Sequence, residues 1–358
     1  MLFNLALKLR ERGVEQDFLT LLPGGGLVSR FQDEGFRVEH LGMKQGVPSF
    51  GALLRVRKGL AERRPDVIFG WLYHSCIAAA LAAPRGIPLV WGIHHALSNL
   101  SEEKPLTRFL IKAGPYLKRK VSHYVYVSET SAHHHYAVGY PCENAEVIPN
   151  GFDLDRFRRD ERLRADVRAE LGIREEQIAF GSAARFNPNK NQVGLVEALG
   201  GLSAPNALLL MVGREVDGNN AELKRAIEAQ GLQGRVILLG ERSDMSRLMN
   251  GMDVYVSASK WGESFPLVLG EAMASQVPCI STDLGDCREI VGDTGRVVPP
   301  DDVLALREAM AWMSALPPDA RAELGRKARK RVEDNYSLER IADRYLEVCR
   351  GVLAQKRA

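Results

Sequence analysis

The sequence predicts an α/β protein made of two doubly wound domains. Its 358 residues are enough for about two domains of roughly 150 residues each. Short apolar runs that are typical of buried strands alternate with helix-like stretches along both halves, which is the pattern of parallel sheets covered by helices. An apolar content of 45% and a charged content of 26% are ordinary for a globular chain.

The first domain is expected over residues 1–149, and it begins with an amphipathic helix near Leu2–Leu9. A doubly wound domain normally starts with a strand and a glycine-rich turn ahead of that helix. We therefore expect a truncated start, in which the first strand is absent and its neighbours lack ladder partners. Pro23–Gly26 indicates a turn before the next helix rather than a phosphate loop. The expected strands are Asp17–Leu22, Val67–Gly70, Leu89–Ile93 and His123–Val127.

The second domain is expected over residues 150–335, after the turn-rich segment Pro149–Asp153. Residues 336–358 carry apolar side chains at helical spacing behind Ser337, which predicts a C-terminal helix. In the second domain we expect strands at Ile178–Ser182, Ala207–Val212, Arg235–Leu239, Val254–Val256 and Cys279–Ser281, with helices near 192–199, 221–230 and 245–250 between them.

Composition excludes several classes of protein. No window approaches the roughly 20 apolar residues of a membrane span, and charges interrupt the first ten residues, unlike a signal peptide. The five cysteines have no metal-ligand spacing and indicate reduced thiols in a cytosolic protein. A net charge of +3 argues against nucleic acid as a partner. His133–His135 cannot all face one ion on a helix, so we expect no metal site there.

Two carboxylates, Glu263 and Glu271, flank a predicted junction between a loop and a helix. Pro266 fits the first helical position, where a missing N–H carries no penalty. The free N–H groups of this helix start suit a phosphate, and the flanking carboxylates suit hydroxyl groups. The alternative is that both are ordinary acids favoured by the helix dipole. Arg185 and Lys190 upstream favour binding of a nucleotide-sugar.

This stretch resembles the Glu-x7-Glu signature of the family 4 glycosyltransferases, which have the GT-B fold of two Rossmann-like domains facing a cleft. The resemblance implies a nucleotide-sugar donor linked to UDP or GDP, transfer with retention of anomeric configuration, and neither a metal nor a separate cofactor. It also implies that residues 336–358 pack back on the first domain. Further similar segments are Ile93–His95, Val147–Asp153, Ala184–Lys190, Met211–Gly213, Val236–Gly240 and Gly295–Pro300.

The resemblance also implies roles for single residues. His94, at the carboxyl end of a predicted strand, corresponds to the histidine that faces the reacting sugar, although His95 is a competitor and a structural role is an alternative. Arg185 and Lys190 would neutralise the leaving diphosphate, and Glu263 would bind the sugar. Because Pro266 has no N–H, main-chain contacts to the donor would come from Phe265 or Leu267. The full set assigned to donor binding is Glu271, Phe265, Leu267, Val268, Gly240 and Arg242.

The acceptor side of the chain carries a basic, partly apolar stretch. Lys112, Lys118, Arg119 and Lys120 alternate with apolar residues, which could rest on an anionic membrane surface. An ordinary amphipathic helix with its apolar face in the core is the favoured alternative.

The sequence therefore predicts a cytoplasmic glycosyltransferase, at the inner face of the membrane, that uses a glycan or polyprenyl-linked acceptor in cell-surface polysaccharide or lipopolysaccharide synthesis. A nucleotide-sugar epimerase and a non-catalytic nucleotide-binding subunit are alternatives. A Rossmann dehydrogenase is disfavoured because no GxGxxG opens either half.

Overall fold

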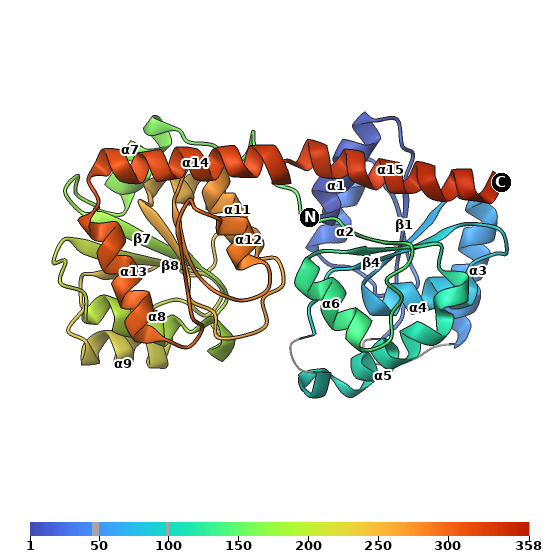
Figure 1. The fold of residues 1–358 in the computed structure, drawn as a ribbon, viewed down its shortest axis with the longest axis horizontal. Helices are drawn as coiled ribbons and strands as arrows, with labels where there is room; N and C mark the ends of the chain where they lie inside the picture. Colours follow the sequence, from blue (N-terminus) through green and yellow to red (C-terminus); the bar gives the residue numbers. More distant parts are fainter. Residues whose placement is uncertain (45–49, 98–99, 358) are drawn as a thin grey trace. The chain divides into compact units, whose positions relative to one another are not determined.

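The structure, a computed structural model, describes residues 1–44, 50–97 and 100–357 and has the predicted α/β class. The chain divides into two compact units (Figure 1). Unit 1 comprises Met1–Gly151 and Leu338–Ala358, and unit 2 comprises Phe152–Ser337. These breaks lie close to the boundaries expected at 149/150 and 335/336. Among the described residues, no helix is long and apolar enough to cross a membrane.

Unit 2 is built on a six-stranded, fully parallel sheet of order β12-β11-β10-β7-β8-β9. In chain order, β7, β8 and β9 form one half of the sheet from the centre to one edge, and β10, β11 and β12 form the other half from the centre to the opposite edge. The two central neighbours, β7 and β10, thus mark the point where the strand order reverses. The strands are β7 (Ile178–Ala183), β8 (Ala207–Val212), β9 (Val236–Leu238), β10 (Val254–Ser257), β11 (Cys279–Thr282) and β12 (Arg296–Val298).

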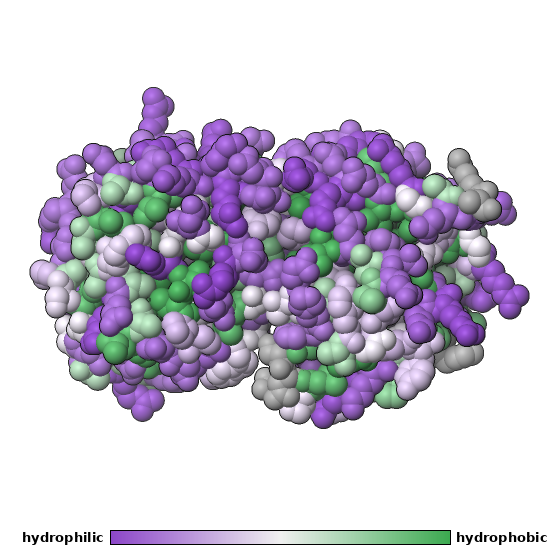
Figure 2. All heavy atoms as spheres, in the orientation of Figure 1, coloured by the Kyte–Doolittle hydropathy of each residue, from purple (hydrophilic) through white to green (hydrophobic). Residues whose placement is uncertain are grey.

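Helices cover both faces of this sheet, and its central strands are buried on both sides. All six residues of β8 are buried, as expected of a strand inside a doubly wound domain. The outward face of α14 is mostly hydrophilic in Figure 2. The helices of unit 2 are α7 (Glu161–Glu170), α8 (Gln192–Gly200), α9 (Ala221–Ala229), α10 (Met245–Leu248), α11 (Leu267–Ala274), α12 (Cys287–Val291), α13 (Val303–Ala315) and α14 (Pro318–Tyr336), with short 3-10 turns η3 (Pro188–Lys190) and η4 (Met249–Gly251).

Unit 1 contains two separate parallel sheets. One is the pair β1 (Asp17–Thr20) and β2 (Arg37–His40), and the other has the order β3-β4-β5-β6. Among the described residues no strand joins β1 to β3. The four-stranded sheet consists of β3 (Ile68–Trp71), β4 (Leu89–Ile93), β5 (His123–Tyr126) and β6 (Ala145–Val147).

The C-terminal helix α15 (Leu338–Arg357) packs on unit 1 with α1 (Leu2–Glu11) (Figure 1). Its buried residues Ile341, Tyr345, Val348 and Val352 form one stripe that contacts Val90 and Val125 of the sheet. Ion pairs Lys8–Glu339 (3.2 Å) and Arg12–Asp343 (2.5 Å) tie the two helices together. The other helices of unit 1 are α2 (Gly26–Asp33), α3 (Phe50–Arg63), α4 (Leu72–Ala82), α5 (Pro105–Ala113) and α6 (Glu129–Ala137), with 3-10 turns η1 (Leu100–Glu102) and η2 (Gly114–Lys120).

Strands β2, β6 and β12 were not predicted from the sequence. Each has only three or four residues, and β2 and β12 are edge strands that contain charged side chains. Such strands bury little apolar surface, so the alternating apolar pattern that identifies a strand is weak. Pro266 was also misplaced by one position, because it is the N-cap of α11 and Leu267 is the first helical residue.

Candidate active site

The candidate site of unit 2 lies at the carboxyl ends of β7 and β10. Because these strands are hydrogen-bonded neighbours, the loops that follow them meet at the same edge of the sheet. Ligands of doubly wound sheets bind in this position, at the reversal of strand order. The two loops and the start of α11 surround a cavity of about 120 Å³ lined by Ser182, Ala183, Ala184, Lys190, Tyr255, Ser257, Ala258, Ser259, Glu263, Pro266, Leu267 and Val268.

Lys190 and Glu263, which are 73 residues apart, form an ion pair in this cavity. The Lys190 Nζ and Glu263 Oε1 atoms are 2.5 Å apart, and the Ser259 hydroxyl donates to the same carboxylate oxygen at 2.6 Å. The Glu263 side chain is only 10% exposed and that of Lys190 is 23% exposed. An ammonium group has three donors, so Lys190 can hold Glu263 and still donate to an anion in the cavity.

Glycines allow the loops around this pair to approach one another closely. A side chain on Gly285 would meet the Ser264 carbonyl oxygen at 2.4 Å, and one on Gly213 would meet the Ala184 carbonyl oxygen at 2.0 Å. Asn187 caps η3 by accepting a hydrogen bond from the Asn189 N–H. These contacts fix the backbone on both sides of Lys190.

The amino terminus of α11 opens into the same cavity through Leu267 and Val268. The N–H groups of its first turn have no partner within the helix, so this end attracts anions. Glu271 follows one turn later and is partly buried. Burial raises the pKa of the Glu271 carboxyl, and the nearby Arg156 partly opposes this effect. A hydroxyl donor would stabilise this desolvated carboxylate.

The other predicted donor contacts of unit 2 differ in their surroundings. The Phe265 ring is buried between Phe152 and Tyr336, with ring centroids 6.1 and 5.5 Å away, so only its main chain can reach a ligand. Arg185 is exposed, and the described residues offer its guanidinium no ion-pair partner. The Arg185 cation therefore remains available to an anion.

Gly240 and Arg242 lie in the turn after β9. The Gly240 carbonyl accepts from the Gly213 N–H at 2.8 Å, which joins this turn to the one after β8. The Arg242 guanidinium is bound by Asp244 at 2.8 Å and Glu170 at 3.3 Å. Neither residue lines the cavity that contains Lys190 and Glu263, and a donor role for Arg242 stays a prediction.

Unit 1 places His94 and His95 in different surroundings. The His94 ring stacks on Trp71 with centroids 4.0 Å apart and lies 3.4 Å from the Tyr345 hydroxyl. Burial lowers the pKa of His94 to about 3, so its ring is neutral at physiological pH. The His95 ring, by contrast, is 41% exposed and pairs with Glu103 through an Nε2–Oε1 distance of 2.6 Å. Ser131 donates to the His95 carbonyl and fixes its backbone.

Sequence reasoning missed three of these site residues. Ser259 lies four residues before Glu263, a spacing that could have identified it as a partner for the carboxylate. The pairings of Glu103 with His95 and of Trp71 with His94 depend on where separate strands and loops meet. No sequence signal indicates these two contacts. The described residues contain no cluster of three or more His, Cys, Asp or Glu side chains arranged to hold a metal ion.

Comparison with known proteins identifies the family. The profile described as "Glycosyltransferase Family 4" matches residues 1–156, and the one described as "Glycosyl transferases group 1" matches residues 164–331. The chain belongs to the family 4 glycosyltransferases. The Anabaena protein HepE, solved in complex with UDP, superposes with a TM-score of 0.86 at 23% identity over 98% of this chain and 96% of that one. This likeness establishes the GT-B fold.

Curated glycosyltransferase relatives match parts of the chain. The phosphatidyl-myo-inositol mannosyltransferase of Mycolicibacterium smegmatis is 34% identical over 47% of this chain and 42% of its own length. The lipopolysaccharide core biosynthesis mannosyltransferase LpsB of Rhizobium meliloti is 28% identical over 55% of this chain and 58% of its own length. The chain thus matches about half the length of these relatives.

Proposed function

We propose that this family 4 glycosyltransferase transfers a sugar from a UDP- or GDP-linked donor to a glycan or lipid-linked glycan acceptor in cell-surface polysaccharide or lipopolysaccharide synthesis. The observation that carries the proposal is the meeting of a cation, a carboxylate and a free helix amino terminus at the edge of β7 and β10. A nucleotide-sugar offers a group for each of them. The relatives described as mannosyltransferases, and the UDP complex of HepE, support the same class of substrate.

In the proposed reaction the donor diphosphate lies against Arg185, Lys190 and the first-turn N–H groups of α11. These groups neutralise the charge that develops on the leaving phosphate, which is where fixed dipoles and cations lower a barrier most. Glu271 accepts from ribose hydroxyls, and Glu263 accepts from hydroxyls of the transferred sugar. With this arrangement the donor needs no bound metal and no further cofactor.

The bond changes fit retention of anomeric configuration. The bond between the anomeric carbon and the phosphate oxygen breaks as the acceptor oxygen bonds to that carbon on the same face. The leaving phosphate takes the acceptor proton, so no protein carboxylate has to act as a base. Glu263, already held by Lys190 and Ser259, then serves to orient the sugar.

The proposed function is tested by a screen for transfer. The full chain is incubated with UDP-glucose, UDP-galactose or GDP-mannose and with lipid-linked or soluble glycan acceptors, and products are analysed by mass spectrometry and NMR. We expect transfer from one donor class, with the donor's anomeric configuration preserved. Inversion in the product would refute the proposed geometry of attack. Conversion of the donor without an acceptor would instead indicate an epimerase.

We also propose peripheral contact with the cytoplasmic face of a membrane, through a surface on unit 1. Residues 104–128 contain six lysines and arginines and no acidic residue. The apolar residues Leu110, Ile111 and Leu117 pack into the core, as the favoured alternative expected, but Phe109 and Tyr116 are 65% and 88% exposed. Cations beside exposed aromatic rings suit an anionic lipid surface.

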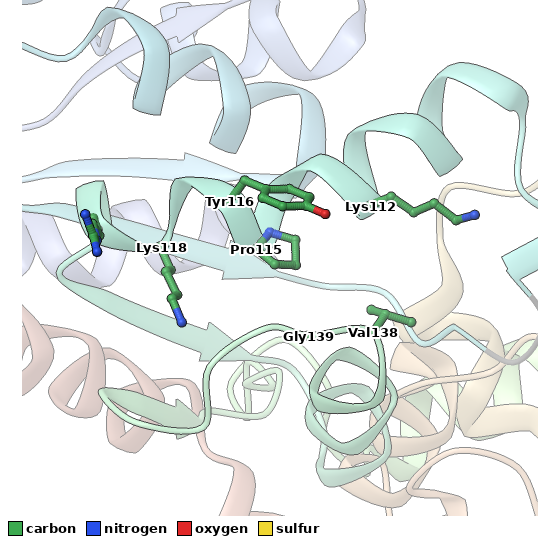
Figure 3. A pocket seen from close by; sticks show the side chains of 7 residues that line it. Lys112, Pro115, Tyr116, Lys118, Val138 and Gly139 are labelled. Atoms are coloured by element: carbon green, nitrogen blue, oxygen red, sulfur yellow. The ribbon is translucent and has the colours of Figure 1, made fainter.

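A shallow cavity of about 530 Å³ lies on this surface and is lined by Lys112, Pro115, Tyr116, Lys118, Arg119, Val138 and Gly139 (Figure 3). In Figure 3, Lys112 and Lys118 extend from the α5–η2 segment, and Val138 and Gly139 come from the turn after α6. The hydroxyl of the buried Tyr140 donates to the Ile111 carbonyl and holds the segment in place. We therefore propose that lipid phosphates contact this cationic cavity.

Vesicle flotation tests the membrane proposal. The full chain should bind vesicles containing phosphatidylglycerol but not pure phosphatidylcholine, and high salt should release it. One lysine near an anionic surface contributes about 1 kcal/mol to the free energy of membrane binding, so Lys118→Ala should weaken binding to these vesicles about fivefold. Lys58→Ala, an exposed lysine on α3 of the same unit, is the control. Equal effects of the two changes would contradict the assignment of this surface.

A further inference from the structure

Trp261 is an exposed aromatic side chain on the loop between β10 and α11, with 42% of its surface in contact with solvent. The other three tryptophans have ring partners: Trp71 stacks on His94, Trp91 contacts Tyr124, and Trp312 lies under the Arg296 guanidinium. Within the part of the chain that the structure describes, the Trp261 ring has no such partner. An exposed aromatic ring offers apolar surface on which a ligand can pack.

The backbone that carries Trp261 is held by several contacts. The Lys260 N–H donates to the Asn189 carbonyl at 2.7 Å, and the Asn189 side-chain amide donates to the Trp261 carbonyl at 3.2 Å. Lys260 forms an ion pair with Asp301 at 2.7 Å. Gly262 has φ +80°, a left-handed conformation that favours glycine at this turn. The ring therefore stands on a fixed loop, which lowers the entropy lost when a ligand binds.

The position of Trp261 relative to the donor cavity indicates which ligand it meets. Ser259 and Glu263 both line that cavity, whereas the three residues between them do not. Residues 260–262 connect these two lining residues, and Trp261 is the central one of the three. The loop places an exposed aromatic ring two positions from Glu263, whose carboxylate is fixed by Lys190 and Ser259.

A sugar ring matches this pair of groups. Its hydroxyls donate to a carboxylate, and its C–H face is apolar and packs against an aromatic ring. We propose that Trp261 stacks on the sugar ring of the nucleotide-sugar donor and helps to select it. This inference rests on the proposed function and adds to it a residue that contacts the sugar but neither the diphosphate nor the nucleoside.

Calorimetry on the full-length variants Trp261→Ala and Trp261→Phe tests the proposal, with UDP, UDP-glucose, GDP and GDP-mannose as probes. Loss of a stacked ring should weaken binding of the recognised nucleotide-sugar about tenfold. Binding of the matching nucleoside diphosphate should change by less than about twofold, because that ligand has no sugar to stack. Trp261→Phe should retain most of the affinity, and the control Trp312→Phe should match the unchanged protein. The nucleotide-sugar but not the diphosphate should reduce acrylamide quenching of tryptophan fluorescence in the unchanged protein, and this protection should disappear in Trp261→Phe.

Three outcomes would overturn the inference. Equal losses of affinity for the nucleoside diphosphate and the nucleotide-sugar in Trp261→Ala would mean that Trp261 stabilises the loop or contacts the nucleotide rather than the sugar. Unchanged affinity in Trp261→Ala would mean that the ring does not meet the donor. If the unchanged protein binds none of the probes, the proposed function itself fails and this inference fails with it. The first two results leave the proposed function standing, because they require a wild-type protein that binds donor.

Discussion

Breaking the pair between Lys190 and Glu263 should weaken unit 2 much more than breaking a similar pair on the surface. In Lys190→Met the Glu263 carboxylate keeps its hydrogen bond from Ser259 but loses its cation, although only 10% of the side chain is exposed. A hydrogen bond to a charged group is worth roughly 1.5–3 kcal/mol. Both partners are less than a third exposed, so solvent screening removes little of this. We expect a loss of about 2 kcal/mol in the free energy of unfolding of unit 2.

The matched control is Lys330→Met on α14 of the same unit. The Lys330 Nζ atom lies 2.6 Å from Asp334, but these side chains are 69% and 52% exposed. Exposed pairs at this spacing on a helix contribute little to stability, because solvent screens the charges and two long side chains lose conformational freedom. The two substitutions are chemically identical, so their difference isolates the effect of burial.

Hydrogen exchange followed by mass spectrometry is the appropriate assay for a protein with two units, because peptides from β7 and β10 report the opening of unit 2 alone. Exchange there should accelerate about 30-fold in Lys190→Met and about twofold in Lys330→Met. In the double variant Lys190→Met/Glu263→Gln the loss should be smaller than the sum of the single losses, because no unpaired charge remains. Equal acceleration in the two single variants would refute the reasoning.

Three further predictions concern the same unit. Gly213→Ala should lower the stability of unit 2 by about 1–3 kcal/mol in thermal unfolding, because the new methyl group would meet the Ala184 carbonyl oxygen. An unchanged melting temperature would show that the turns that contain Gly213 and Ala184 can separate freely. Burial raises the pKa of the Glu271 carboxyl, so at this residue the folded state binds more protons than the unfolded state. The folded state therefore loses stability as pH rises from the ordinary carboxyl pKa through the raised one. Glu271→Gln should raise the melting temperature at neutral pH, but not at pH values below the ordinary carboxyl pKa. Transfer should persist in excess chelator, because Arg185, Lys190 and the α11 amino terminus are proposed to hold the diphosphate, and activity that disappears and returns with Mg²⁺ or Mn²⁺ would contradict this.

Much of the fold could be predicted from local sequence patterns. The apolar runs at 89–93 and 207–212 became buried strands within the predicted bounds, and the helical spacing after Ser337 became α15. Buried parallel strands have strong signals because both of their faces are apolar. The edge strands β2 and β12 have weak signals because one edge of each faces solvent or loops, which permits charged residues. The order of the strands within each sheet was not predicted, since it depends on how distant segments pair.

For the candidate site, the sequence by itself determined the types of group and their approximate places: two carboxylates around a helix start, two cations after an earlier strand, and two histidines at a strand end. Motif spacing carries this information because a loop and the helix that follows it are contiguous in the chain. Only the tertiary structure decided which groups meet. It paired Lys190 with Glu263 across 73 residues, because β7 and β10 are neighbours in the sheet. It also stacked the His94 ring on Trp71 and paired the partly exposed His95 ring with Glu103. These partners come from other segments of the chain, and no local sequence pattern encodes which segments meet.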